Sequence, residues 1–117
     1  MNGCEVWDVV KVPFPYTGRP VHQYRPALVI ALNNGKETPR LLWVLMITSA
    51  ENGGWSGDVE ITDLDGAGLP VASVVRTAKI ATMEQDVAER IGRLALPDRR
   101  RVIDAVRDRL AVAGVCA

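Results

Sequence analysis

The first two thirds of the chain consist of short apolar runs separated by residues that favour turns. Residues 6–12, 27–32 and 41–48 have the length and aliphatic character of strands. In the first of these runs both faces are largely apolar, which indicates a strand covered on both sides. Two prolines directly after it predict its end, because proline cannot donate a ladder hydrogen bond, and residues 17–24 are expected to form a loop.

The middle of the chain continues in short extended pieces. An Asn33-Asn34-Gly35 turn is expected between the second and third strands, since asparagine and glycine tolerate positive φ. Several glycines then predict a loop that carries Trp55. Further strands are predicted at residues 58–62, 71–75 and 79–82, and residues 87–96 predict a short helix followed by a strand near 91–94.

A helix is predicted to begin at Pro97, which suits a first helical turn, with Asp98 beside it. Its apolar positions follow helical spacing and Gly114 is expected to end it. The inward positions are Val102, Ile103, Val106 and Leu110, and the outward ones are Arg99, Arg100, Asp104 and Arg107. Short strands followed by one helix predict a mainly β fold with α (α+β), in which a strongly bent barrel or half-open sheet packs against the helix.

Composition narrows the functional classes. The 117 residues are expected to form a single domain, residues 1–117. Fourteen basic and fourteen acidic side chains balance, so any site for a polyanion must be a local patch. The cysteines Cys4 and Cys116 fit neither a metal site nor a disulfide framework, and no apolar run or leader predicts a membrane segment. We therefore expect a cytoplasmic protein without a metal or other cofactor.

The candidate catalytic residues lie at the ends of two predicted strands. In the run Arg25-Pro26-Ala27-Leu28-Val29-Ile30, Pro26 favours an extended Arg25 at the mouth of the second strand. The third strand ends in Thr48 and Ser49, so an arginine and two hydroxyls could converge. The alternative is that Arg25 only solvates a strand edge and the hydroxyls only begin a turn.

Aromatic and basic side chains gather in the predicted loops, where bases of single-stranded RNA could stack. The same residues could instead cover the rim of a small core or anchor a protein partner. His22 is the single imidazole and could serve as a general base, although a lone loop histidine is usually an ordinary surface residue. Arg99-Arg100-Arg101 is usually a solvated helix face. The candidate RNA-binding residues are Lys11, Tyr16, Arg19, His22, Tyr24, Trp55, Arg76 and Lys79.

Taken in order, several segments resemble the MazF/PemK family of type II toxin–antitoxin ribonucleases. Asp8-Val9-Val10-Lys11-Val12-Pro13-Phe14-Pro15-Tyr16-Thr17 resembles the opening strand and its exit, and the Arg25-Pro26 run resembles the second strand. Ile47-Thr48-Ser49 is similar to the end of the third strand. The later strands are matched by Gly68-Leu69-Pro70, Ser73-Val74-Val75-Arg76, Lys79-Ile80-Ala81-Thr82 and Ile91-Gly92-Arg93-Leu94. One departure is Trp7, which precedes Asp8 where many relatives have Gly-Asp.

The resemblance implies a small SH3-like barrel of short antiparallel strands with a C-terminal helix, a homodimer, and metal-independent cleavage of single-stranded RNA at short sequences. It implies that Arg25 takes part in proton transfer and stabilises the transition state, with Thr48 assisting and Ser49 adjacent. Because arginine is almost always protonated, the stabilising role is favoured over a role as a base. The 2′-hydroxyl would attack its own phosphate, giving 2′,3′-cyclic phosphate and 5′-hydroxyl ends.

The resemblance also implies partners. A cognate antitoxin is expected to cover the RNA-binding surface, and operator DNA is expected to be bound only through the toxin–antitoxin complex. The alternatives are a non-catalytic toxin or binding module on the same fold, such as a topoisomerase poison of the CcdB type, or an inactive homologue. Arg25 and Thr48 argue against a protein-binding poison, which has no need of an arginine and a hydroxyl at neighbouring strand ends.

Overall fold

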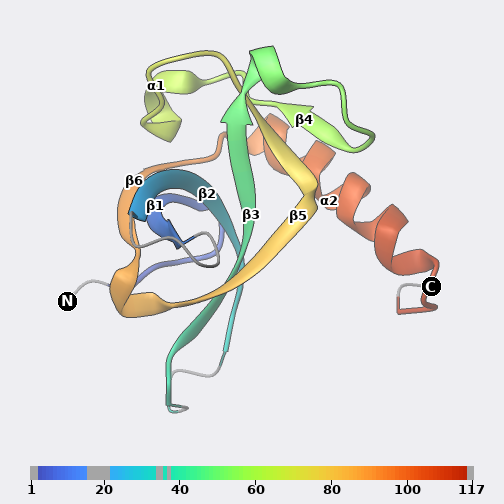
Figure 1. Ribbon diagram of the computed structural model, residues 1–117. Helices are drawn as coiled ribbons and strands as arrows, with labels where there is room; N and C mark the ends of the chain where they lie inside the picture. Colours follow the sequence, from blue (N-terminus) through green and yellow to red (C-terminus); the bar gives the residue numbers. More distant parts are fainter. Residues whose placement is uncertain (1–2, 16–21, 34–35, 37, 116–117) are drawn as a thin grey trace.

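Six antiparallel strands form one sheet in the order β4-β5-β3-β2-β1-β6 (Figure 1). The structure is a computed structural model that describes residues 3–15, 22–33, 36 and 38–115, without the side chains of residues 14, 15 and 22. The strands are β1 (Asp8–Pro15), β2 (His22–Leu32), β3 (Leu41–Ser49), β4 (Asp58–Glu60), β5 (Ser73–Glu84) and β6 (Glu89–Arg93). The helices are α1 (Leu64–Ala67) and α2 (Leu96–Ala111), with 3₁₀ turns η1 (Ala50–Asn52) and η2 (Gln85–Val87).

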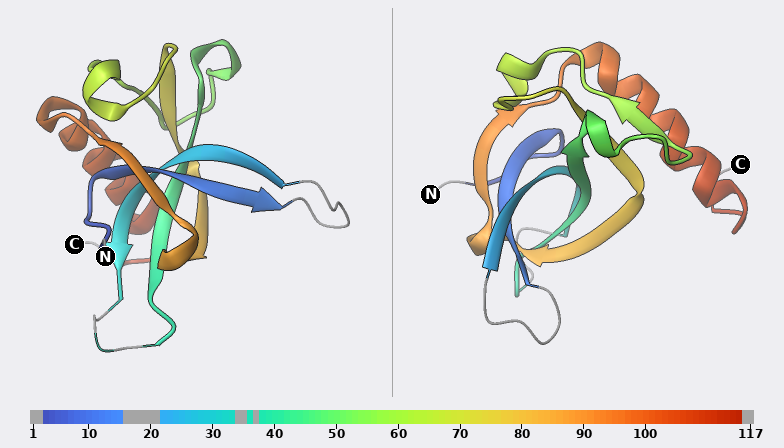
Figure 2. Two further views of the ribbon diagram at one scale, coloured as in Figure 1. Left: turned by 90° about the vertical axis from the view of Figure 1, so that its left-hand side faces the viewer. Right: turned by 45° about the horizontal axis from the view of Figure 1, so that its top comes forward.

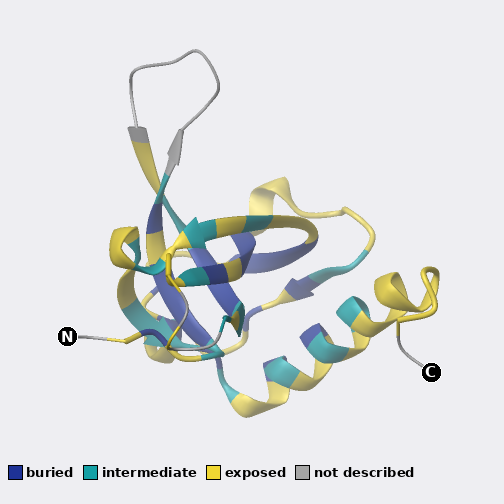
Figure 3. Ribbon diagram, turned by 90° about the horizontal axis from the view of Figure 1, so that it is seen from below, coloured by how far each residue is buried: buried dark blue, intermediate teal, exposed yellow. Residues whose placement is uncertain are grey.

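The sheet is strongly curled, as the two views of Figure 2 show, and this confirms the predicted mainly β fold with a C-terminal helix. Alternating residues of the central strands point into two apolar clusters on opposite faces. Val9, Leu28 and Leu45 belong to the outer cluster, which α1 and α2 cover. Val10 and Val44 belong to the inner cluster, enclosed by the curl. Coverage of both faces explains why the central strands are apolar throughout, and Figure 3 shows their buried residues together.

The prediction that β1 ends before its two prolines is wrong. Pro13 pairs with Tyr24 and Pro15 pairs with His22, so β1 and β2 continue as a ribbon beyond the barrel (Figure 2, left). β6 pairs with β1 only as far as Lys11. Among the described residues, none pairs with the other edge of β1 past this point, and a proline there removes no ladder hydrogen bond. Tyr24, expected in a loop, consequently lies in a strand.

β5 is one long strand instead of the two short pieces predicted. Met46 of β3 pairs with Arg76, whereas Leu45 pairs with Ile80, so residues 77–79 form a bulge. A bulge adds twist and bends the strand. Before the bulge, residues 74–76 pair with β4 on one edge and with β3 on the other, and beyond it β5 continues along β3 (Figure 2).

α1 was not predicted and is a single turn. The Asp63 side chain accepts a hydrogen bond from the Gly66 amide at its start, and Gly68 ends it with a φ of 73°. A Cβ at Gly68 would lie 2.0 Å from the Ile91 carbonyl oxygen, so the loop after α1 packs against β6 only because this residue has no side chain. Glycine therefore fixes where this loop lies.

α2 begins one residue before the predicted Pro97 and packs beside β4 and β5. Val102 is buried as expected, whereas Leu110 is 40% exposed. Asp98 is also fully buried. Its carboxylate can be buried because it accepts hydrogen bonds from the Thr62 backbone amide (2.8 Å) and hydroxyl (3.0 Å). Arg101 donates to the same carboxylate, so part of the basic cluster on this helix has a structural role.

In the part of the chain that the structure describes, no helix is both long and apolar enough to span a membrane.

Two further residues named by the sequence analysis are structural. Asp8 is buried, and its carboxylate accepts hydrogen bonds from the Glu5 amide (2.8 Å) and from Arg93 (2.8 Å). It therefore connects β1 to β6. Cys4 is a buried free thiol in the inner cluster, and burial raises its pKa. Cys116 lies outside the described residues.

Candidate active site

A cavity of about 730 Å³ opens where β1, β2 and the end of β3 meet the loop after α1. These elements come from distant parts of the chain, and the curl of the sheet brings them together (Figure 1). The polar residues lining the cavity include Lys11, Arg25, Thr48, Ser49, Asn52 and Asp65. The arginine and the two hydroxyl residues predicted to converge therefore share one cavity.

Arg25 lies where pairing between β2 and β3 ends. The last paired residues are Ala27 and Met46, and the same antiparallel register continued by two residues places Arg25 opposite Thr48. On its other side Arg25 still pairs with Val12 of β1, so its backbone is held in an extended strand. Its Nη2 donates to Gln23 Oε1 at 2.8 Å. The prediction that Arg25 begins the strand is wrong, since β2 begins at His22, but the residue does mark the end of one ladder.

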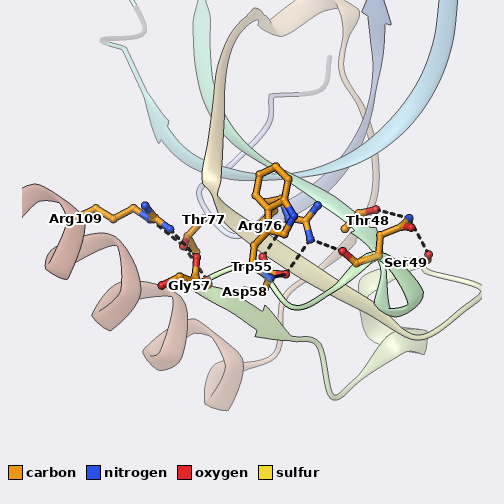
Figure 4. A network of polar contacts seen from close by, with 10 residues as sticks. Thr48, Ser49, Trp55, Gly57, Asp58, Arg76, Thr77 and Arg109 are labelled. Carbon is orange, nitrogen blue, oxygen red and sulfur yellow. Dashed lines mark hydrogen bonds and ion pairs between the residues drawn. The ribbon is translucent and has the colours of Figure 1, made fainter.

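Thr48 and Ser49 are the last two residues of β3 and pair with Val74 and Ser73 of β5. Both are half-buried. Asn52, in the 3₁₀ turn that follows, donates from Nδ2 to Thr48 Oγ1 at 3.2 Å and to Ser49 Oγ at 3.3 Å (Figure 4). One amide group thus holds both hydroxyl oxygens at the cavity wall.

Behind this turn lies a network centred on Arg76. Its guanidinium donates to Asp58 from Nη2 (2.9 Å) and Nε (3.2 Å), and from Nη2 to the Asn52 carbonyl oxygen (2.6 Å). The Trp55 ring covers the same guanidinium, with 3.9 Å from Cζ to the ring centroid (Figure 4). Arg76 is only 7% exposed. Its charge is therefore engaged by the protein on several sides.

The ion pair between Arg76 and Asp58 shifts the pKa of both side chains. The hydrogen bond from Arg76, helped by the Trp55 amide, holds the pKa of Asp58 below its usual value, although burial acts in the opposite direction. The hydrogen bond to Asp58 raises the pKa of Arg76. Both shifts favour the charged forms. The pair is therefore ionised at neutral pH and is a fixed feature of the site.

The loop that carries Trp55 is attached to its neighbours at several points. Arg109 of α2 donates to the Ser56 carbonyl oxygen at 2.7 Å, and the Thr77 hydroxyl donates to the Gly57 carbonyl oxygen at 2.8 Å (Figure 4). Gly57 has a φ of 87°. A Cβ there would lie 2.6 Å from Thr77 Oγ1, so glycine permits this close contact.

The remaining candidate RNA-binding residues are spread out. Lys11 is exposed and lines the cavity. Tyr24 is 67% exposed on β2 beside Arg25, but it is not part of the cavity lining. Lys79 is exposed in the β5 bulge and is likewise not part of the lining. Tyr16, Arg19 and the side chain of His22 lie outside what the structure describes.

Several residues of the site were missed from the sequence, among them Asn52, Asp58 and Asp65. Asn52 lies three and four residues after Ser49 and Thr48, a spacing that a tight turn brings together, and this was an available signal. Asp58 and Arg76 are paired across β4 and β5, eighteen positions apart, and only the sheet register brings them together. Among the described residues, no three His, Cys, Asp or Glu side chains are grouped so as to hold a metal ion.

The sequence also matches a family model over residues 5–113, that of the PemK-like, MazF-like toxin of type II toxin–antitoxin systems. The chain belongs to this toxin family. The match covers most of the chain and includes every lining residue of the cavity named above. A comparison of this toxin with curated protein sequences found no match.

Solved structures of MazF toxins share the fold of this toxin. MazF from Deinococcus radiodurans (form I) is 22% identical, with a TM-score of 0.73 over 95% of this chain and 99% of that one. The MazE–MazF structure (form II) from the same organism is 22% identical, with a TM-score of 0.68 over 100% of both chains. A mycobacterial endoribonuclease in complex with its cognate antitoxin is 14% identical, with a TM-score of 0.66 over 96% of both chains.

Proposed function

We propose that this toxin is a metal-independent endoribonuclease that cuts single-stranded RNA. The observation that carries the proposal is the cavity shared by Arg25 from β2 and by Thr48 and Ser49 from the end of β3. A guanidinium fork and hydroxyl donors are the groups that stabilise charge developing on a phosphate. The solved mycobacterial endoribonuclease with the same fold supports this assignment.

The proposed reaction is transfer of a phosphate ester within the RNA. The ribose 2′-oxygen forms a bond to the adjacent phosphorus, and the bond from phosphorus to the 5′-oxygen of the next nucleotide breaks. The 2′-hydroxyl proton passes to a base, and the departing oxygen takes up a proton. The products are a 2′,3′-cyclic phosphate and a 5′-hydroxyl end, so no water and no redox partner is consumed.

Arg25 acts in this reaction as an electrostatic clamp. Arginine side chains stay protonated near neutral pH, which suits stabilisation of a phosphorane-like transition state and does not suit removal of a proton. Thr48 and Ser49 donate further hydrogen bonds to the phosphate oxygens. The groups to test as general base are His22, because an unperturbed imidazole has a pKa near neutrality, and Asp65, which lines the cavity.

The RNA-binding surface extends from the cavity toward Trp55. Lys11 supplies positive charge within the cavity, and Trp55, 53% exposed, offers a ring face on which an unpaired base can stack. Bases are available for stacking only when they are unpaired. Single-stranded RNA is therefore the proposed substrate, cut at short sequences in the cytoplasm.

The proposed partners are a second copy of this chain and a cognate antitoxin that covers the cavity. The same-fold MazE–MazF structure from Deinococcus radiodurans and the mycobacterial toxin in complex with its cognate antitoxin support the antitoxin. Operator DNA would be contacted only through the toxin–antitoxin complex. Because the toxin's charges balance, a strong preference for nucleic acid must come from the local surface around the cavity.

The deciding experiment incubates the purified toxin with a long single-stranded RNA in excess EDTA, beside Arg25→Ala, and analyses the fragment ends. We expect discrete cuts with 5′-hydroxyl ends, slowed by about 10²–10³-fold or more in the variant, because a preorganised donor to a developing oxyanion is worth that much. Lys36→Ala, an exposed cation outside the cavity lining, is the control. Absence of cleavage across varied RNAs would overturn the proposal and favour a non-catalytic toxin or an inactive homologue.

A further inference from the structure

We propose that Asn52 is a positioning residue that turns the hydroxyls of Thr48 and Ser49 into hydrogen-bond donors aimed at the substrate phosphate. The inference rests on the proposed ribonuclease function and adds a residue that neither the sequence motifs nor the family resemblance singled out. Asn52 lies in η1, directly after β3, and lines the same cavity as both hydroxyls.

The numbers of hydrogen-bond donors and acceptors on these groups support this role. A hydroxyl group has one hydrogen to donate and two lone pairs that accept, and left alone it rotates to suit whichever neighbour is present. An amide nitrogen carries two hydrogens and no acceptor. Asn52 Nδ2 directs these at Thr48 Oγ1 (3.2 Å) and Ser49 Oγ (3.3 Å). Each oxygen therefore accepts from the amide and keeps its own hydrogen for donation elsewhere.

The direction of these hydrogen bonds matters for phosphate chemistry. In the transition state negative charge grows on the phosphate oxygens, which can only accept hydrogen bonds. A hydroxyl that points a lone pair at them would repel that charge. By occupying one lone pair on each hydroxyl oxygen, the amide favours the rotamer in which the O–H bond points into the cavity.

The turn that carries Asn52 is itself fixed. Arg76 Nη2 donates to the Asn52 carbonyl oxygen at 2.6 Å, and the Gly53 amide donates to the Ala50 carbonyl oxygen at 3.0 Å. Arg76 in turn is held by the buried carboxylate of Asp58 and by the ring of Trp55 (Figure 4). The Asn52 side chain thus starts from a backbone that is anchored on both sides of the residue, as a positioning group requires.

Three variants separate this role from its alternatives. Asn52→Ala removes the amide but leaves the hydroxyls able to donate when they rotate suitably. Asn52→Asp keeps the shape and replaces the donor with an acceptor, so the hydroxyls would donate to the carboxylate and turn away from the phosphate. Ala50→Asp places the same negative charge in the same turn, at an exposed position outside the cavity lining, and controls for simple repulsion of RNA.

The measurement is single-turnover cleavage of an RNA oligonucleotide in EDTA, with RNA affinity and thermal melting recorded for every variant. We expect Asn52→Ala to lower the cleavage rate constant about 10-fold and Asn52→Asp about 100-fold or more, by analogy with the loss of one oxyanion donor, with RNA affinity and melting little changed by Asn52→Ala. Ala50→Asp should change affinity more than the rate constant. In a Thr48→Val, Ser49→Ala background, Asn52→Ala should cause no further loss, because nothing remains to orient.

The outcomes are distinguishable from those of the proposed function. A wild-type toxin that does not cut RNA overturns the ribonuclease assignment itself. A wild-type toxin that cuts RNA while Asn52→Ala cuts at the same rate overturns only the role of Asn52. So does an equal loss from Asn52→Asp and Ala50→Asp, or a full additional loss from Asn52→Ala when both hydroxyls are already absent.

Discussion

The guanidinium of Arg76 lies against the indole of Trp55, 3.9 Å from Cζ to the ring centroid. The sequence places both residues among the candidate RNA-binding residues. The two side chains differ in their surroundings. Arg76 is bound by Asp58, by the Asn52 carbonyl oxygen and by the ring, whereas Trp55 is 53% exposed. A cation against one side of an indole holds the ring in place. We therefore predict that Trp55 stacks on a base and that Arg76 supports its ring.

Trp55→Ala should weaken binding of single-stranded RNA by about 1–3 kcal/mol, the range measured for loss of one base-stacking ring. Trp43→Ala is the matched control, because Trp43 is also 53% exposed but lies on β3 away from the candidate active site. Titration of a catalytically slow Arg25→Ala background with labelled RNA measures both. Equal effects of the two tryptophan variants would contradict a specific role for Trp55.

Asp58→Asn should make stability less dependent on acid. The pKa of Asp58 is lowered in the folded protein, so its ionised form contributes stability that is present above its ordinary pKa of about 4 and lost as the pH falls through the lowered value. At neutral pH the variant should therefore be less stable than the wild type. Denaturant titrations between pH 7 and pH 2 should show this difference shrinking below about pH 4. Parallel curves over that range would show that the pair does not contribute through its charge.

The central parts of β1, β2 and β3 and the catalytic candidates were accessible from sequence because their signals are local. The run after Arg25 and the run before Thr48 are apolar and bounded by turn residues, and antiparallel pairing of neighbouring strands brings their ends together. Helix α2 was equally clear from its spacing and from Pro97. Local pattern thus positioned most of the cavity.

The supporting network was not accessible, because it depends on register between distant segments. Asp58 reaches Arg76 only when β4 pairs with β5 in one register, and the register of β5 along β3 changes at the bulge of residues 77–79. No periodicity in the sequence announces such a bulge. The predicted end of β1 at its prolines was wrong for a related reason. A strand can contain these prolines only because β6 stops pairing with β1 before them.

Asp98→Ala should destabilise the fold by about 2–4 kcal/mol, since it removes a fully buried carboxylate that accepts charge-assisted hydrogen bonds from Thr62 and Arg101. The loss would loosen α2 from the segment after β4. Asp104→Ala on the same helix is the control, because Asp104 is exposed and lies 3.9 Å from Arg100, a pair expected to contribute at most about 0.5 kcal/mol. Denaturant unfolding compares them, and similar losses would contradict a structural role for Asp98.

At position 7, replacement of Trp7 by glycine should give a more stable protein than replacement by alanine. This is the reverse of the usual order in strands and helices. Its φ is 79°, in the left-handed region, at a turn closed by the Asp8 amide and the Glu5 carbonyl oxygen. A Cβ in this region costs roughly 1–2 kcal/mol, which glycine avoids. Both variants lose the same indole packing against the outer cluster, so that loss cancels in their difference.

We therefore expect Trp7→Gly to be about 1 kcal/mol more stable than Trp7→Ala by denaturant unfolding, with both below the wild type. The same pair of substitutions at Thr82, an exposed residue within β5, provides the internal reference. There alanine should be the more stable by roughly 0.5–1 kcal/mol, because glycine loses more backbone entropy on folding. If alanine were also favoured at position 7, the turn would have to adopt a negative φ, and the backbone amide of residue 7 could no longer be held at 2.8 Å from the Val29 carbonyl oxygen in the same geometry.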